Sequence, residues 1–336
     1  MTRIFAATLL VIVVAFTAHA FPDRPLTLIT PYPANGYPDL DGTSRVSRLL
    51  KTMHKYSSPP LTDSLAQEVA QLLSGELSQP VGFERRGNGN ALATAEAIAA
   101  AKPDGHTLLF AGNQTITLLP SLYPHSTFDP RTDLAPVATI ASMPMVLITR
   151  KAGSALDIKA LIARARMAPG RLNYAVIGDG STAQLAGRLF QARNGIDVVH
   201  LNYNGSLPAI NAVIQAEVAF GVVPLPAVLP SLPGGLVRVL AIAAPARHPA
   251  IPDVPSLREF GLSGLDATGW FGVFAPVGTP KAIASTLNQS IRVVMGYDFI
   301  ESGLIKRGLG PLPGTVDDFR ALIERDNARA LAARSL

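Results

Sequence analysis

Short apolar runs alternate with helix-like patterns along most of the chain, and this alternation constrains the fold more than any other feature. Several runs are almost continuously apolar, which is typical of strands buried on both faces of a parallel sheet. Alternating strands and helices predict an α/β fold with parallel strands. The predicted strands cover residues 26–30, 107–111, 145–149, 172–177, 198–201, 218–223 and 236–243.

Helical spacing of apolar residues marks the segments between these strands. Residues 156–168 and 183–193 follow this pattern, and so does a segment that begins near residue 62. We expect Thr62 or Asp63 to cap this last helix, because both residue types are favoured at that position. Its predicted buried stripe consists of Leu65, Val69, Leu72, Leu73 and Leu77.

Composition excludes several classes of protein. The 336 residues include no cysteine, so disulfide frameworks and iron–sulfur sites are ruled out. No two of the six histidines have the spacing of metal ligands, and no G-x-S-x-G or Walker A motif occurs. The formal charge of +5 is too small for a nucleic-acid footprint. The sequence therefore predicts no metal, no cofactor, no nucleic-acid partner and no catalytic residue; we expect a protein that is not an enzyme.

The first twenty residues have the pattern of a secretory signal peptide. Arg3 precedes an apolar run over residues 4–17, and Ala18-His19-Ala20 places small residues at a cleavage site. The alternative is a membrane anchor, but this run is shorter than the roughly 20 residues that a spanning helix needs. We expect cleavage after Ala20 and a periplasmic protein.

One glycine-rich segment permits two interpretations. Residues 172–183 form a predicted strand, a turn and a helix start that spell G-x-G-x-x-A, a loose dinucleotide fingerprint. Asp197 lies about 20 residues further on, but it precedes a strand instead of ending one, which argues against nicotinamide binding. The segment otherwise predicts an anion site of backbone N–H groups at a helix N-terminus, or a plain N-cap loop.

Two more loops follow predicted strands. Residues 31–36 leave the first strand, and residues 202–206 follow the strand at 198–201. The carboxyl ends of parallel strands are where open α/β sheets bind ligands. None of these loops brings a charged pair suited to acid–base catalysis. The loops therefore favour binding of a small anion by neutral donors.

With these loops in place, the chain resembles the Bug family, also called TctC-like proteins, the periplasmic solute receptors of tripartite tricarboxylate transporters. The resemblance runs over nearly the whole chain after residue 20. It is carried by F-P-D-R-P-L-T-L-I-T-P-Y-P from Phe21, A-A-A-K-P-D-G-H-T-L-L-F-A from Ala99, P-S-L-Y from Pro120, P-G-R-L-N-Y-A from Pro169, L-A-G-R-L-F from Leu185, I-P-D-V-P-S from Ile251 and T-G-W-F-G-V-F-A-P-V-G-T-P from Thr268.

This resemblance implies a type II periplasmic-binding-protein fold, with two α/β lobes and a ligand cleft between them. The first lobe would comprise residues 21–142 and, after the chain returns, 273–336. The second lobe would comprise residues 143–272. Two crossover strands near residues 137–148 and 270–276 would join them.

The resemblance also implies which residues bind the ligand carboxylate, through backbone N–H groups, hydroxyls and ordered waters rather than through arginine. In the first lobe these are Tyr32, Ala34, Asn35, Gly36, Asp63, Asn113 and Thr115. In the second lobe they are Gly178, Asp179, Gly180, Ser181, Thr182, Gln184, Tyr203, Asn204 and Gly205. Asp39 competes with Asp63 for the role of the cleft aspartate.

The chain departs from the family pattern in two ways. Residues 37–59 are an insertion, which we interpret as a surface excursion or as an amphipathic lid over the cleft. In addition, several polar positions of the family differ here, which is expected to weaken or redirect ligand recognition. These positions hold Val176, Ile177, Gln184, Ala219 and Val223.

These features together predict a monomeric extracytoplasmic receptor that binds a small carboxylate. It would close its lobes on the ligand and dock onto the membrane subunits of a tripartite tricarboxylate transporter. One alternative is a receptor that signals to a membrane histidine kinase. A more distant alternative is a nicotinamide-dependent oxidoreductase.

Overall fold

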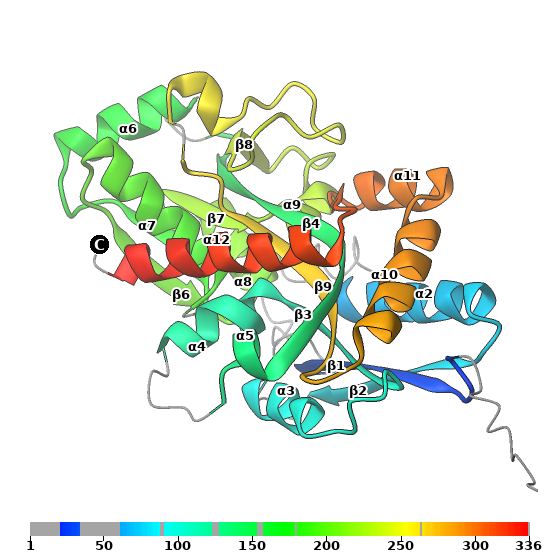
Figure 1. The fold of residues 1–336 in the computed structure, drawn as a ribbon. Helices are drawn as coiled ribbons and strands as arrows, with labels where there is room; N and C mark the ends of the chain where they lie inside the picture. Colours follow the sequence, from blue (N-terminus) through cyan, green and yellow to red (C-terminus); the bar gives the residue numbers. More distant parts are fainter. Residues whose placement is uncertain are drawn as a thin grey trace, which may run out of the picture.

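The computed structural model of the protein describes residues 21–33, 61–87, 91–122, 128–152, 157–178, 180–262 and 264–334 (Figure 1). The predicted leader at 1–20 and the insertion at 37–59, with Asp39, lie outside the described residues. Within those described, no helix is long and apolar enough to cross a bilayer.

The strands of the described chain join one mixed sheet. Along the sheet the order is β2-β1-β3-β9-β4-β7-β5-β6, while β10 and β8 also pair with β4. The strands are β1 (Leu26–Pro33), β2 (Val81–Gly87), β3 (Thr107–Gly112), β4 (Leu134–Arg150), β5 (Asn173–Ile177), β6 (Val199–Tyr203), β7 (Phe220–Pro224), β8 (Val237–Ile242), β9 (Thr268–Pro276) and β10 (Gly310–Pro311).

Helices fill the connections between these strands. The α-helices are α2 (Leu61–Glu76), α3 (Ala91–Ala99), α4 (Leu119–Leu122), α5 (Pro130–Asp133), α6 (Ile158–Met167), α7 (Thr182–Asn194), α8 (Ser206–Ile214), α9 (Leu225–Val228), α10 (Lys281–Met295), α11 (Asp298–Lys306) and α12 (Val316–Arg334). A π-helical turn, η1 (Gln114–Leu118), follows β3, and 3₁₀ turns occur at η2 (Leu229–Ser231) and η3 (Leu257–Phe260).

Strand β4 connects the two halves of the sheet. Its first part pairs with β9 from Leu134 to Pro144, and its last part pairs with β7 and β8 from Met145 to Arg150. We call the half built on β1, β2, β3, β9 and the first part of β4 the first lobe. The second lobe is the half built on the last part of β4 with β5, β6, β7 and β8.

In each lobe, helices cover both faces of that half of the sheet. In the first lobe, α2, α10 and α11 pack on one face, and α3, η1 and α12 pack on the other. In the second lobe, α6 and α7 cover one face, and α8 and α9 cover the opposite face. Alternate β4 side chains enter opposite cores: Leu147 enters one, and Val146 and Ile148 enter the other. This double burial explains why these strands are continuously apolar.

All seven predicted strands overlap observed ones, so the α/β prediction is confirmed. The helix after the insertion is also confirmed as α2, but its expected cap is wrong. Asp63 lies inside the first turn of α2, and its carboxylate bonds to residues of other elements. Strand β2 was not predicted, because its sequence V-G-F-E-R-R-G is half-exposed and charged at the edge of the sheet.

The last helix connects the lobes a second time. Helix α12 runs from the first lobe toward α7 (Figure 1). Near its end, Ala330 packs with Leu118 of η1 and with Leu185 of α7. Arg329 Nη1 also donates to the backbone carbonyl of Asp266. The return segment, expected to belong to the first lobe, therefore also contacts the second.

A buried histidine gives a further contact between the lobes. His248 follows β8, and its Nδ1 accepts a hydrogen bond from the N–H of Ala250 at 3.1 Å. The proton consequently sits on Nε2, which lies 3.1 Å from the Leu309 carbonyl oxygen and donates to it. Burial lowers the pKa of His248 below its ordinary 6.5.

This lowered pKa predicts a pH-dependent stability. Unfolded His248 takes up a proton near pH 6.5, whereas the folded ring does so only at lower pH. The contribution of the neutral, buried ring to the free energy of unfolding is therefore present above pH 6.5 and is lost as the pH falls. The His248→Gln variant has no titrating ring and keeps a donor for Leu309. Urea unfolding at about pH 7 and pH 5.5 should therefore show a smaller loss of unfolding free energy in the variant. An equal loss in both proteins would contradict this assignment.

Candidate functional site

The predicted binding loops lie at the carboxyl ends of parallel strands in both lobes. In the first lobe, β1 runs parallel to β2 and β3. In the second, β5 runs parallel to β6 and β7, and Ile177 pairs with Tyr203 at the ends of β5 and β6. The loops that follow these strands thus begin at the carboxyl ends of the parallel strands in each half of the sheet, as the sequence predicts. Ala34, Asn35, Gly36 and Asp179 lie outside the described residues.

In the first lobe, Tyr32 is fixed against the end of β3. Its hydroxyl accepts a hydrogen bond from the N–H of Gly112 at 2.8 Å, and Thr115 Oγ1 donates to it at 3.4 Å. Thr115 is fully buried and belongs to η1. Tyr32 and Thr115, predicted from distant parts of the sequence, are therefore in contact.

Asn113 precedes η1, where buried polar groups hold the chain. Thr117 Oγ1 lies 2.8 Å from the Asn113 carbonyl oxygen and 2.7 Å from Asp326 Oδ2 of α12. Thr117 and Asp326 are both buried. π-Helical turns are rare and are often found at functional sites. This one ties the loop after β3 to the helix that reaches the second lobe.

Asp63 is completely buried, and among the described residues its carboxylate bonds to side chains of the first lobe. Thr30 Oγ1 donates to its Oδ1 at 3.1 Å, and Arg85 Nε donates to its Oδ2 at 2.6 Å. Arg85 Nη2 also contacts Oδ2. Both carboxylate oxygens thus have protein partners. The sequence analysis missed Arg85, since it lies on the unpredicted strand β2.

In the second lobe, the glycine-rich turn caps α7. Ser181 Oγ accepts a hydrogen bond from the N–H of Gln184 at 3.1 Å, and Gln184 Oε1 accepts from the N–H of Gly180 at 3.0 Å. Gly178 and Gly180 have positive φ angles of 64° and 66°, which glycine adopts readily. The N-cap interpretation is confirmed for Ser181, and Gln184 completes the cap.

The loop after β6 leads directly into α8. Gly205 precedes Ser206 with a φ of 114° and provides no side-chain cap. Asn204 is exposed, and Tyr203 is half-buried. Burial raises the pKa of Tyr203, and the carboxylate of Glu217 raises it further. The Tyr203 phenol therefore stays protonated at neutral pH and remains a hydrogen-bond donor.

The dinucleotide interpretation fails on geometry. Gly178 and Gly180 follow the carboxyl end of β5, whereas Asp197 precedes β6 and lies beside Gly170 at the amino end of β5. The Gly170 N–H donates to the Asp197 carbonyl at 2.9 Å. Because the parallel strand β5 separates the two positions by about 16 Å, Asp197 cannot reach a ribose held at the glycine turn.

The two lobes meet through two of the predicted site residues. The Asn113 side-chain amide faces the Thr182 hydroxyl, with Nδ2 to Oγ1 at 3.1 Å and Oγ1 to Oδ1 at 3.2 Å. Both side chains are more than nine-tenths buried. The loop after β3 and the first turn of α7 are consequently in direct contact. The structure brings together opposite sides of the expected site at this pair.

Most of the residues that depart from the family pattern belong to the core. Val176 packs with α6 and α7, and Ile177 and Val223 pack with α8 and α9. Ala219 is half-buried beside the first of these clusters. Three of these side chains therefore stabilise the second lobe.

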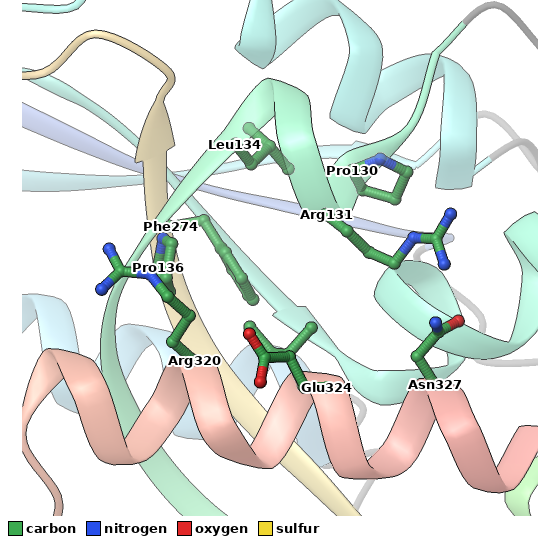
Figure 2. Close-up of a pocket in the computed structure, with 9 residues that line it drawn as sticks. Pro130, Arg131, Leu134, Pro136, Phe274, Arg320, Glu324 and Asn327 are labelled. Atoms are coloured by element: carbon green, nitrogen blue, oxygen red, sulfur yellow. The ribbon is translucent and has the colours of Figure 1, made fainter.

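Two surface hollows of the described chain lie away from the predicted site residues. One, of about 190 Å³, lies between the start of β4, Phe274 of β9 and α12 (Figure 2). Arg131 and Arg320 line it, and they pair with Asp129 and Asp317 respectively. None of the predicted site residues borders it, so we do not assign the site there. The described residues also include no group of three or more acidic or histidine side chains that could hold a metal ion.

Comparisons with known proteins agree with this architecture. The family model described as "Tripartite tricarboxylate transporter family receptor" matches residues 65–333. The Bordetella pertussis protein BugT is 30% identical over 333 residues, covering 96% of this chain and 94% of BugT.

Two solved structures from Rhodopseudomonas palustris are similar over almost their full length. Rpa4515, determined with adipate, has a TM-score of 0.75 and 28% identity, covering 94% of this chain and 97% of its own. MatC, determined with bound malate, has a TM-score of 0.71 and 26% identity, covering 93% and 99%.

The Asn113–Thr182 contact predicts a measurable effect on the arrangement of the lobes. Thr182→Val removes the hydroxyl and leaves a buried amide unpaired only when the lobes touch. This change should disfavour contact between the lobes by about 1 kcal/mol, or roughly fivefold in population. Small-angle X-ray scattering of the ligand-free protein should show a larger radius of gyration.

Thr149→Val is the matched control for this experiment. Thr149 is also buried, but its hydroxyl donates to the Ala219 carbonyl within the second lobe at 3.3 Å. This variant should lose stability without changing the radius of gyration. Equal radii for Thr182→Val and the wild type would mean that this pair does not hold the lobes together.

Proposed function

The chain belongs to the family of tripartite tricarboxylate transporter receptors, and we propose that it captures a small carboxylate between its lobes and delivers it to the membrane subunits of such a transporter. The observation that carries this proposal is the meeting of the loop after β3 with the first turn of α7 at Asn113 and Thr182. A ligand held there touches both lobes and favours the arrangement in which they are close. Relatives solved with adipate and malate support a carboxylate as the ligand class.

Neutral donors suit this ligand class. The first turns of α7 and α8 direct backbone N–H groups toward the carboxyl edge of the second-lobe sheet. Tyr203 adds a protonated phenol, and Thr182 adds a hydroxyl. Such groups recognise a carboxylate without transferring a proton to it. We therefore propose binding and release of an unchanged ligand, with no turnover.

Export and partner choice complete the proposal. We propose that residues 1–20 are a leader cleaved after Ala20, that the mature protein is a periplasmic monomer, and that its partner is a transporter rather than a histidine kinase. N-terminal sequencing of exported protein tests the leader, since a start at Met1 would refute it. Ligand-dependent capture of membrane subunits by the tagged receptor tests the partner.

Ser181 provides a sharp test of where the ligand binds. Aspartate and asparagine are both good N-caps, so Ser181→Asp and Ser181→Asn should each preserve the start of α7. Only Ser181→Asp places a negative charge beside the proposed carboxylate. Isothermal titration with adipate and malate should show at least tenfold weaker binding for Ser181→Asp than for Ser181→Asn.

Unchanged melting temperatures of both variants provide the folding control. Equal affinities of Ser181→Asp and Ser181→Asn would move the ligand away from the start of α7. A binding heat on titration with NAD, together with no binding heat for carboxylates, would support the oxidoreductase alternative and contradict the proposed receptor function.

A further inference from the structure

Arg85 lies near the carboxyl end of β2, on the side of the first lobe where the binding loops begin. It pairs in register with Thr30, two residues before Tyr32, and β2 ends two residues later at Gly87. Because β1 and β2 are parallel, their carboxyl ends lie on this same side. Arg85 is therefore a positively charged residue near Tyr32, in a site otherwise composed of neutral donors.

The buried carboxylate of Asp63 fixes the orientation of the Arg85 guanidinium. Arg85 Nε lies 2.6 Å from Asp63 Oδ2, and Nη2 contacts the same oxygen. Thr30 Oγ1 holds the other oxygen, Oδ1, at 3.1 Å. Asp63 is fully buried, while the Arg85 side chain is 29% exposed. The ion pair thus has a buried acidic end and a basic end that solvent reaches.

This side-on contact uses only part of the guanidinium. Arginine carries five N–H donors, and Asp63 engages the Nε and Nη2 groups. Among the described residues, no hydrogen bond is made by Arg85 Nη1. The neighbouring Arg86 differs, because Glu84 binds its Nε at 2.6 Å and its Nη2 at 2.9 Å on the exposed surface.

We propose that Arg85 is the cationic contact for the ligand carboxylate and that Asp63 is its positioning residue. This inference rests on the proposed receptor function. It adds an arginine to the neutral donors, which the family resemblance does not imply, and it changes the role expected for Asp63. A carboxylate with both oxygens occupied repels a second carboxylate unless a cation lies between them. Arg85 is that cation, and a guanidinium already held in one orientation loses little freedom when it binds an anion.

If the Asp63–Arg85 ion pair had only a structural role, its removal would not change the affinity for the ligand. Paired substitutions separate this structural role from the proposed ligand contact. Arg85→Gln alone leaves the buried Asp63 charge unpaired, so it should lower the melting temperature whichever role is right. The double variant Asp63→Asn/Arg85→Gln keeps the net charge of the wild type, replaces the buried carboxylate by an amide of the same shape and so removes the unpaired charge. Its melting temperature should return toward that of the wild type.

Isothermal titration with adipate and malate then decides between the roles. We expect the double variant to bind about 10- to 150-fold more weakly than the wild type, as for loss of one charge-assisted hydrogen bond. Arg85→Lys keeps the charge but lacks the planar guanidinium with its paired N–H donors, so this variant should bind with intermediate affinity. Arg86→Gln on the same strand, whose partner is the exposed Glu84, should bind like the wild type.

Wild-type affinity in a folded double variant would overturn the role of Arg85 and leave the receptor function standing. Equal weakening by Arg86→Gln would also overturn it, since the effect would then reflect general surface charge. Failure of the wild type to bind any of a panel of mono-, di- and tricarboxylates would refute the proposed function itself, and this inference with it.

Discussion

The fold depends on β4, a strand of 17 residues that belongs to both halves of the sheet. Its first part is hydrogen-bonded to β9 and its last part to β7 and β8, so the strands of both lobes are joined through it. Nearly all of its side chains are buried or half-buried. Two prolines fit within it: Pro136 adjoins an irregularity in the register, and Pro144 is the last residue to pair with β9.

The position of the site follows from this shared strand. Because β4 holds the two parallel sets of strands in one sheet, the loop after β3 and the first turn of α7 come together at Asn113 and Thr182. Helix α12 reinforces the arrangement through Ala330 and through Asp326, whose carboxylate binds Thr117 in η1. One set of contacts between the lobes thus adjoins the residues proposed to bind the ligand, and His248 with Leu309 forms a separate one.

Part of this site was predictable from the chain alone. The loop after β5 was identified by its glycines and hydroxyls, and Ser181 does cap α7. The roles of Asp63 and Gln184 were not predictable in the same way. Asp63 binds Thr30 and Arg85 from other strands, and Gln184 folds back onto Gly180. Such partners depend on which strands become neighbours, and no local pattern around either residue records that choice.

Strand β2 illustrates the same limit. Apolar periodicity identifies buried strands reliably, since burial on both faces requires apolar side chains at successive positions. An edge strand such as V-G-F-E-R-R-G faces solvent on one side, so its charges resemble those of a loop. Missing β2 also concealed Arg85, the partner of Asp63.

The sequence by itself determined the class of fold, seven of the strands and the loops that follow them, because these follow from hydrophobic periodicity and turn chemistry within short segments. Tertiary structure alone decided which side chains meet: Asn113 with Thr182, Tyr32 with Thr115, and Arg85 with Asp63. The physical reason is that these contacts join residues tens of positions apart. Their geometry is set by strand order and by β4, which crosses from one lobe to the other.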